Sequence, residues 1–541
     1  MGTFVVLFFI YYVDAYSINF PFQDDNSLLQ IILEVEKGLG WKHDLYVFFR
    51  PENDHRLFIP RLISYLDYRL TGHPNFKLFI FIATANLLLV VGFIFRLFRQ
   101  LRLPLYYFLP IPLLLFHPQY HEVSIWALTG LQHTTLFLLL SFTLILLKKP
   151  TAVKTGMAIV LATLATFTHG NGILVFATGV FRLLLEKNYK TLVPWGLFML
   201  MALLFYLAGY TPGSGVKSTI NWAYLPASFV VRIGASLSVF HKVAIGASIV
   251  WGTLISVLVI PAMIKRLGDS FKKRAAVDSV RNELYSFFCF IFLTIALITV
   301  FRASSELVQE NRFKIYAAFS SLLLYLFLLL HFPSFRKGIL VLFTVLAALV
   351  YVNSYTLYTP EVVHKHSRLV ADTYNWPKHQ IELCNFSSVE KSLYFLVPVY
   401  QQGYWQVPTL FNGLDGLIQN AVQRQDFKPY PFQTARFLHD GDGHPQLSFA
   451  IQDLPFQRHH LHDNLLLILH NEANQQTYLV GTSPKFAGWR RFFTKGMLFD
   501  DGLSAVLPIQ VMPPGQYRLG CLLTRPGERS ELMLSQQTVR F

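Results

Sequence analysis

The chain has 541 residues, of which 53% are hydrophobic and only 14% are charged. Because soluble globular chains carry about 25% charged residues, this composition excludes an ordinary soluble protein and indicates an integral membrane protein. The formal net charge is +15, but much of it falls in short loops between apolar segments, which argues against a nucleic-acid-binding domain. Three cysteines without metal-like spacing argue against a disulfide framework and redox chemistry.

The first predicted element is the apolar segment from Thr3 to Tyr16, which is short for a span that needs about 20 residues. No basic region precedes it and no small-residue cleavage site follows, so we expect a retained helix. Asp24 and Asp25 come next, and charges at a membrane surface often mark function. The alternative is a solvated loop in which Asp25 caps a helix from Ser27 to Val35. We expect that helix to lie against the bilayer.

A second polar stretch, Pro51 to Arg56, predicts a further helix in the same loop. Pro51 suits the first helical position. In such a helix Glu52, His55 and Arg56 would share one face. Pro60 should interrupt it, and Arg61 to Leu70 should continue as a helix.

From residue 78 onward the chain is mainly apolar segments of membrane-helix type. The predicted spans are Leu78–Phe95, Pro104–Phe116, Ile125–Leu147, Ala152–Thr168, Ile173–Leu185, Leu192–Ala208, His241–Ile264, Leu284–Phe301, Ile315–Leu330 and Ile339–Tyr358. With the first segment they make about eleven transmembrane helices.

Basic residues fill every second connecting loop, within Arg96–Arg102, Lys148–Lys154, Arg182–Lys190, Lys265–Arg281 and Arg336–Lys337. By the positive-inside rule these loops are cytoplasmic. The N-terminus is then inside, and the acidic pair and the chain after residue 358 are outside.

The remaining polar side chains of the apolar region gather on the outer side in this topology. They are His117, His121, Glu122, Gln132, His133, His169, Asn171, Arg302, Glu306, Glu310 and Arg312. Separate loops therefore converge on one face, although single polar residues also join helices in a purely structural role. His117 and His121 have metal-like spacing, but Pro118 breaks the helical register.

This arrangement resembles the GT-C class of membrane glycosyltransferases, which includes protein mannosyltransferases and aminoarabinose transferases. The resemblance covers residues 1–358 and rests on a first span, an outer loop that opens with an acidic pair, and a soluble tail on the same side. Asp24 and Asp25 correspond to that pair. The run from Glu52 to Arg56 is similar to a Glu-His-Arg segment of the class, with Asn53 and Asp54 departing from its spacing. The turn from Arg302 to Arg312 resembles its arginine-containing outer loop.

The resemblance implies a sugar donor on a polyprenyl phosphate, used at the outer face of the cytoplasmic (inner) membrane, and a glycan, lipid or protein acceptor. A carboxylate suits the base that takes the acceptor proton, and we prefer Asp24 because Asp25 is the better placed to cap a helix. Arginine suits a lipid phosphate. The candidates for donor and substrate binding are Glu52, His55, Arg56, Arg61, His121, Glu122, Arg302 and Arg312.

A divalent cation such as Mg²⁺ or Mn²⁺ would assist the leaving phosphate. Its candidate ligands are Asp24, Asp25, Glu52 and His55, but the sequence leaves metal dependence open.

The tail is more polar and changes its periodicity. Leu447, Phe449 and Ile451 alternate, as do the apolar residues from Tyr517 to Leu523, which predicts strands. We therefore expect a transmembrane domain over 1–358 with its first outer loop at 17–77, a mixed α/β connection over 359–439, and a β-sandwich-like domain over 440–541.

Two other classes of function are consistent with this organisation. A lipid-linked glycan transporter or flippase should show internal repeats and interrupted helices at the midplane, whereas the polar residues here gather at one surface. A non-catalytic scaffold would use the β domain as its binding module.

Overall fold

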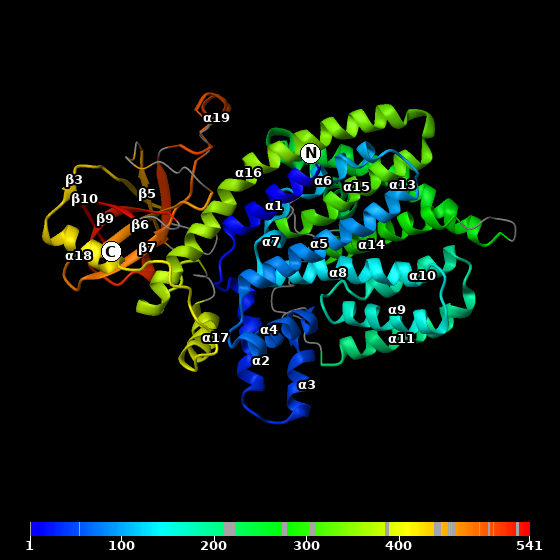
Figure 1. Cartoon of the computed structure of the whole chain (residues 1–541), viewed down its shortest axis with the longest axis horizontal. Coiled ribbons are helices and arrows are strands. Elements are labelled where there is room, and N and C mark those ends of the chain that lie inside the picture. Colours follow the sequence, from blue (N-terminus) through cyan, green and yellow to red (C-terminus); the bar gives the residue numbers. More distant parts are fainter. Residues whose placement is uncertain are drawn as a thin grey trace. The chain divides into compact units, whose positions relative to one another are not determined.

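The structure is a computed structural model of the chain, and it describes residues 2–52, 55–209, 222–272, 278–302, 307, 310–384, 389–437, 445–452, 454, 456, 461–485, 487–495, 498–500, 502–525 and 530–541. The chain forms two compact units (Figure 1). The first unit comprises Met1–Ile10, Glu34–Leu66 and Phe79–Leu357. The second comprises Tyr11–Leu33, Asp67–Leu78 and Tyr358–Phe541.

The first unit is helical. Its segments begin with part of α1 (Gly2–Tyr16), the end of α2 (Asn26–Val35), α3 (Trp41–Phe49) and α4 (Phe58–Thr71), followed by α5 (Phe76–Arg99), η2 (Leu105–Phe108), α6 (Pro110–Leu115), η3 (Pro118–Tyr120), α7 (His121–Ser124), α8 (Ala127–Leu146), α9 (Ala152–Thr166), α10 (Leu174–Leu185) and α11 (Tyr189–Leu207). It continues with η4 (Trp222–Tyr224), α12 (Leu225–Gly234), η5 (Ala235–Val239), η6 (His241–Val243), α13 (Ala244–Ser270), α14 (Ser279–Phe301), η7 (Asn311–Phe313), α15 (Lys314–His331), η8 (Pro333–Phe335) and the start of α16 (Arg336–His379).

Within the described residues, eight helical segments are long and apolar enough to cross a membrane. They are Phe76–Arg99, Ala127–Leu146, Tyr189–Leu207, Trp222–Val239, His241–Ser270, Ser279–Phe301, Asn311–His331 and Pro333–His379. Three shorter apolar helices are Gly2–Tyr16, Ala152–Thr166 and Leu174–Leu185. The prediction of a helical membrane protein is therefore confirmed, and the exact number of spans stays a prediction.

The helices of the apolar region differ from the prediction in two places. The expected span from Pro104 to Phe116 is divided into η2 and α6, because prolines recur in it and proline ends or restarts helical turns. The segment Trp222–Val239, which was not predicted as a span, is helical.

The predicted helix at Pro51 is also wrong. The residues form a short antiparallel pair, β1 (Pro51–Glu52) and β2 (His55–Arg56), in which Glu52 lies opposite His55. Arg50 ends α3 in an extended conformation, which a following proline favours. Glu52, His55 and Arg56 therefore share no helical face, and Asn53 and Asp54 lie outside the described residues.

Two expectations for the neighbouring helices need correction as well. Pro60 does not interrupt a helix, since it lies in the first turn of α4, where its missing N–H group is not needed. The apolar stripe of α2 is buried inside the protein, with Leu28, Leu29, Ile31 and Ile32 at 0% exposure. This stripe therefore does not rest on the bilayer.

The helix α16 has 44 residues and passes through the predicted domain boundary at residue 358. It is about 66 Å long at 1.5 Å per residue, whereas a hydrocarbon core is about 30 Å thick. The residues up to 358 are mainly apolar and those from 359 onward are more polar. A single helix therefore carries both the mainly apolar stretch and the more polar one.

The second unit contains helices and two sheets. After α16 come α17 (Val389–Gln401), α18 (Leu414–Gln423), β3 (Phe427–Lys428), β4 (Gln433–Phe437), β5 (Gln446–Ile451), β6 (Asn464–Asn471), β7 (Gln476–Gly481), α19 (Trp489–Lys495), β8 (Leu503–Pro508), η10 (Ile509–Val511), β9 (Gln516–Thr524) and β10 (Glu531–Arg540).

The strands form a five-stranded sheet of order β3-β10-β9-β6-β7 and a three-stranded sheet of order β4-β5-β8. Alternate residues of β5 and β8, including Phe449 and Ala505, share one core with Leu467, Tyr478 and Leu519 of the larger sheet. The predicted β content after residue 440 is confirmed for the described residues, in which α19 has only seven residues.

Candidate functional site

The predicted site residues belong to different units. Asp24 and Asp25 lie in the second unit, and the remaining candidates lie in the first.

The acidic pair forms the short 3₁₀ turn η1 (Gln23–Asp25) directly before α2. The backbone N–H of Phe22 donates to Asp25 Oδ2 over 3.0 Å, and the Asp25 side chain is buried at 2% exposure. Asp25 thus accepts an amide at the start of the 3₁₀ turn, in the manner of a capping box, and α2 begins directly after it at Asn26. Asp24 is exposed. The turn therefore gives two neighbouring carboxylates different environments.

Polar side chains from four elements meet in the first unit and form what we call the imidazole cluster, His55, His133, His169, Asn171 and Tyr316. The ring centroids of His55 and His169 are 4.5 Å apart, and those of His133 and His169 are 4.8 Å apart. The Tyr316 hydroxyl lies 2.8 Å from His133 Nδ1 and accepts the Asn171 side-chain amide over 2.9 Å. Asn171 Oδ1 pairs with His169 Nδ1.

These contacts form one directed chain of hydrogen bonds. Because Tyr316 accepts from Asn171, its own hydrogen can donate to His133, and Asn171 Oδ1 can accept from His169 Nδ1–H. His133 Nδ1 accepts in this arrangement, so the His133 imidazole is neutral. Burial, reinforced by the neighbouring His55, lowers the pKa of His169, which lies in the loop between α9 and α10.

Charged residues lie next to this cluster. Arg312 donates its backbone N–H to Glu122 Oε2 over 3.0 Å, and its guanidinium pairs with Glu310. The Arg302 guanidinium lies 3.8 Å from a carboxylate oxygen of the same Glu310. Phe313, adjacent in sequence, contacts the His133 ring with centroids 6.1 Å apart. The structure thus brings Glu122, Arg302 and Arg312 together, while Glu306 lies outside the described residues.

The other two arginine candidates bind the chain itself. Arg56 donates to the carbonyls of Phe49, Tyr206 and Ala208, which lie at the ends of α3 and α11. Arg61 donates to the Val47 and Arg50 carbonyls over 3.1 and 2.7 Å and to Glu52 over 2.9 Å. Burial lowers the pKa of Arg61 to about 10.

The two histidines near residue 120, His117 and His121, flank the 3₁₀ turn η3. His117 is fully buried, and its Nε2 lies 2.9 Å from the Leu114 carbonyl. His121 is buried at 6% exposure. Among the described residues, no group of three or more His, Cys, Asp or Glu side chains could hold a metal ion, and metal dependence stays a prediction.

Sequence reasoning missed three contributors, namely Tyr316, Arg232 and Thr294. The Thr294 hydroxyl accepts the Asn171 side-chain amide over 3.3 Å. Tyr316 and Thr294 lie within apolar spans, where hydroxyl groups give no distinct signal. Arg232 donates to the Arg302 carbonyl over 3.3 Å, and a charged residue in an apolar stretch could have been noticed.

Comparisons with protein-family models, curated proteins and solved structures find no match to this chain.

Proposed function

We propose that the protein is a membrane glycosyltransferase of the GT-C type, which transfers a sugar from a polyprenyl-phosphate carrier to a glycan, lipid or protein acceptor. The reaction takes place at the outer face of the cytoplasmic membrane. The observation that carries the proposal is the unequal acidic pair behind the first apolar helix, with Asp24 exposed and Asp25 buried on a backbone amide.

In this reaction Asp24 takes the proton of the acceptor hydroxyl. The acceptor oxygen forms a bond with the anomeric carbon while the bond from that carbon to the phosphate oxygen breaks. Polyprenyl phosphate leaves with the electron pair. The Asp25 carboxylate accepts the Phe22 amide and so holds the turn that carries Asp24. We assign the base to Asp24 and not to Asp25, because a carboxylate held by a backbone amide is a poorer base.

Negative charge develops on the leaving phosphate and calls for fixed cations. Arg302 and Arg312 suit this role because both guanidinium groups pair with Glu310 and both keep part of their surface open, at 45% and 26% exposure. The phosphate would then compete with Glu310 for the two guanidinium groups. A divalent cation on Asp24 would supply further charge, since Mg²⁺ prefers carboxylate oxygens.

The alternative, a lipid-linked glycan transporter or scaffold, uses the same elements without cleaving the donor. Asp24→Asn separates these classes. For a transferase we expect turnover to fall by about 100-fold or more, the contribution of a general base, with donor binding unchanged. A transporter or scaffold releases no polyprenyl phosphate in either form.

The measurement is release of polyprenyl phosphate from a panel of radiolabelled polyprenyl-phosphate sugars by the purified protein in nanodiscs. Asp426→Asn is the matched control, because Asp426 is an exposed carboxylate in a surface ion pair with Lys428. Equal turnover of Asp24→Asn and Asp426→Asn would rule out Asp24 as the base.

A further inference from the structure

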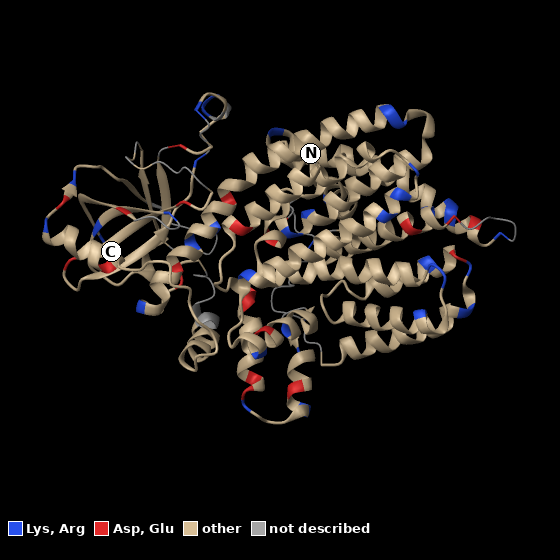
Figure 2. Ribbon diagram, in the orientation of Figure 1, with Lys and Arg blue, Asp and Glu red and all other residues tan. Residues whose placement is uncertain are grey.

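The basic loops of the first unit lie at one end of its helix bundle. The Lys148 ammonium donates to the Gln100 side-chain oxygen over 3.3 Å, which joins the ends of α8 and α5. The Tyr189 hydroxyl donates to the Ser270 carbonyl over 3.4 Å, which joins α11 to α13. The Tyr285 hydroxyl lies 2.9 Å from His331 Nε2, and this hydrogen bond joins α14 to α15. In Figure 2 many of the Lys and Arg positions, coloured blue on the ribbon, gather at the right-hand helix ends. We call this face the basic end.

The described part of the basic end holds most of the net charge of the protein. It has fifteen basic residues, namely Arg96, Arg99, Arg102, Lys148, Lys149, Lys154, Arg182, Lys187, Lys190, Lys265, Arg266, Lys272, Arg281, Arg336 and Lys337. It has four acidic residues, namely Glu186, Asp269, Asp278 and Glu283. The difference is +11, out of +15 for the whole chain.

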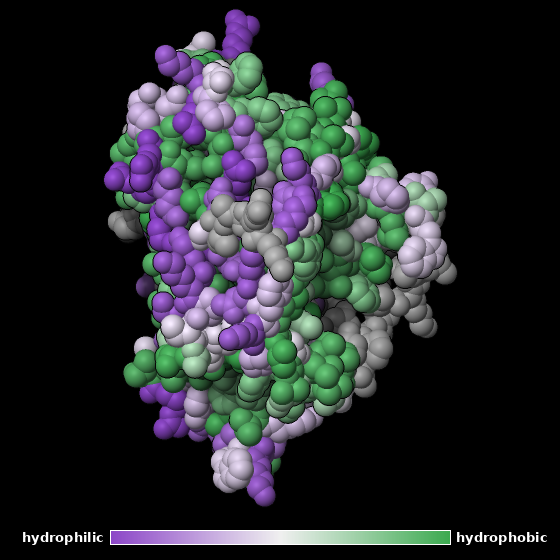
Figure 3. All heavy atoms as spheres, turned by 90° about the vertical axis from the view of Figure 1, so that its right-hand side faces the viewer, coloured by the Kyte–Doolittle hydropathy of each residue, from purple (hydrophilic) through white to green (hydrophobic). Residues whose placement is uncertain are grey.

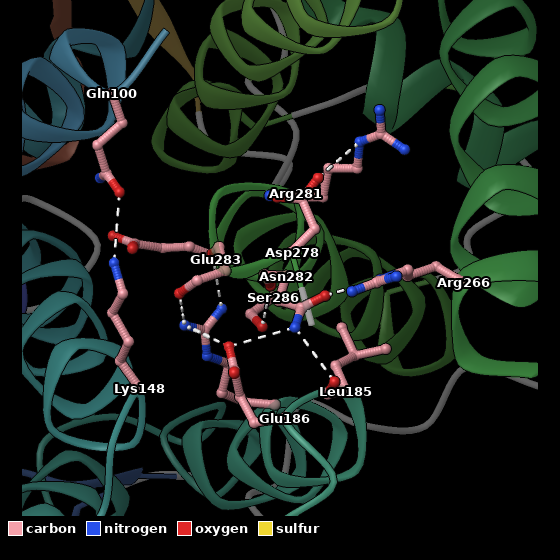
Figure 4. Close-up of polar contacts among 12 residues, drawn as sticks. Gln100, Lys148, Leu185, Glu186, Arg266, Asp278, Arg281, Asn282, Glu283 and Ser286 are labelled. Carbon is pink, nitrogen blue, oxygen red and sulfur yellow. Dashed lines mark hydrogen bonds and ion pairs between the residues drawn. The ribbon is translucent and has the colours of Figure 1, made fainter. Parts of the chain in front are cut away.

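An inner layer of this end is already neutralised. Figure 4 shows the polar network in which Asn282 donates to Glu186 and to the Leu185 carbonyl and accepts from Arg266 over 2.9 Å. Arg182 pairs with Glu186 over 2.9 Å, and Glu283 pairs with Arg96. Arg182 and Glu283 are buried at 0% and 1% exposure. These charges hold helices together and are not offered to a ligand.

The other two acids are also occupied. Asp269 pairs with Lys272 over 2.7 Å and Asp278 with Arg281 over 3.0 Å. No acid at the described part of this end therefore remains to balance the outer bases.

Seven outer bases are exposed and make no ion pair or side-chain hydrogen bond with the described residues. They are Arg99, Arg102, Lys149, Lys154, Lys190, Lys265 and Lys337. Large aromatic side chains are exposed at the same end, including Tyr106 at 59%, Phe271 at 60% and Phe335 at 68%. Figure 3, which looks onto this end, shows hydrophilic side chains in a band bordered by hydrophobic ones.

We propose that the basic end binds anionic phospholipid headgroups through its outer bases. The seven charges lie at the ends of apolar helices, where headgroups are found, and the exposed Tyr106 favours the same layer because tyrosine is enriched at membrane interfaces. Anionic headgroups supply the charge that no acid of this end provides, and each nearby Lys or Arg strengthens such binding. This inference does not depend on the reaction proposed above.

The test compares the purified protein in non-ionic detergent with the triple variant Lys190→Gln, Lys265→Gln, Lys337→Gln. Native mass spectrometry measures binding of phosphatidylglycerol, of zwitterionic phosphatidylcholine and of inorganic phosphate. We expect a preference for phosphatidylglycerol, weakened about fivefold for each charge removed and so on the order of 100-fold in the triple variant.

The control is Lys485→Gln, Arg490→Gln, Lys495→Gln, which removes three exposed charges from the second unit. It should keep the preference, and thermal unfolding should show both variants folded, because the replaced side chains make no ion pair or side-chain hydrogen bond with the described residues. Equal binding of the two phospholipids, equal losses in both variants, or displacement of lipid by equimolar inorganic phosphate would each overturn the proposal.

Discussion

At the scale of single residues, Asp372 predicts a pH dependence of stability. It lies on α16, 14 residues beyond residue 358, and is fully buried. Its carboxylate accepts the N–H groups of Leu383 and Cys384 over 2.7 and 2.8 Å. Burial raises the pKa of Asp372 to about 7, although these amides oppose the shift.

The sign follows from proton binding. Between the unfolded pKa of about 3.9 and the folded pKa the folded state binds more protons, so stability falls as pH rises through this window, by at most about 4 kcal/mol. Asp372→Asn does not titrate and should remove this loss. Thermal unfolding at pH 5 and pH 8 measures it as the difference between wild type and variant. A wild-type midpoint that shifts with pH no differently from that of the variant would contradict the assignment.

The histidines explain why the variant is needed as a reference. Burial lowers the pKa of His470, whose Nδ1 lies 2.9 Å from the hydroxyl oxygen of Thr477. The unfolded state then binds more protons below pH 6.5, so this group favours folding as pH rises. Its effect is opposite to that of Asp372, and only subtraction isolates the carboxyl.

The sequence predicted which polar residues converge, but it did not predict what the arginines bind. The sequence predicted that polar residues of separate outer loops converge, and His133, His169 and Asn171 do meet. It could not predict that Arg56 and Arg61 bind backbone carbonyls, because those carbonyls are unpaired only after α3 and α11 have ended. Which helix ends lie beside an arginine is a tertiary property.

At the scale of elements, the contact between α12 and α13 depends on glycine. A Cβ atom at Gly252 would lie 1.9 Å from the Val230 carbonyl oxygen, and one at Gly234 would lie 1.9 Å from that of Ser248. Small residues four apart let membrane helices approach this closely. Gly252→Ala should therefore destabilise the protein by about 1–3 kcal/mol, the usual cost of overpacking.

Gly246→Ala is the matched control on the same helix, since no atom lies within 4 Å of a Cβ there. It should be neutral or stabilise by up to about 1 kcal/mol through helix propensity. Thermal unfolding in detergent measures both. Similar midpoints for the two variants would show that the close approach is unimportant.

The errors in the predicted elements have identifiable physical causes. The helix α12 is short and contains Arg232, so the segment around it has the lowest hydropathy of the eight candidate spans, 1.2. The pair β1–β2 was mistaken for a helix because Pro51 suits a helix start, but the same proline holds Arg50 extended. In both cases a local signal had two interpretations, and packing decided between them.

At the scale of the whole molecule, composition and periodicity predicted the two kinds of architecture. Apolar runs became the helices of the first unit, and alternation at Leu447 to Ile451 became β5 with alternate residues buried. The division into units was not predictable, because the second unit takes Tyr11–Leu33 and Asp67–Leu78 from the N-terminal region. Such long-range assembly leaves no mark in local periodicity.

The charge of the basic end predicts the membrane topology. The basic end carries +11 within the described residues, so the positive-inside rule predicts that it is cytoplasmic. The helix α16 begins there with Arg336 and Lys337 and has one mainly apolar stretch, up to residue 358. A single crossing then places the second half of α16 and the β strands that follow it on the outer side.

Single cysteines at Lys337 and Arg540 test this with a membrane-impermeant maleimide on intact cells. Cys384 and Cys521 are buried and Cys289 is partly buried, so the unsubstituted protein gives the background. We expect Arg540→Cys to react from outside and Lys337→Cys only after permeabilisation. Lys190→Cys should behave like Lys337→Cys, because α11 begins at the same basic end. Labelling of Lys337→Cys and Arg540→Cys from the same side would mean that α16 does not cross the membrane, and the outer-face reaction would then lose its topological basis.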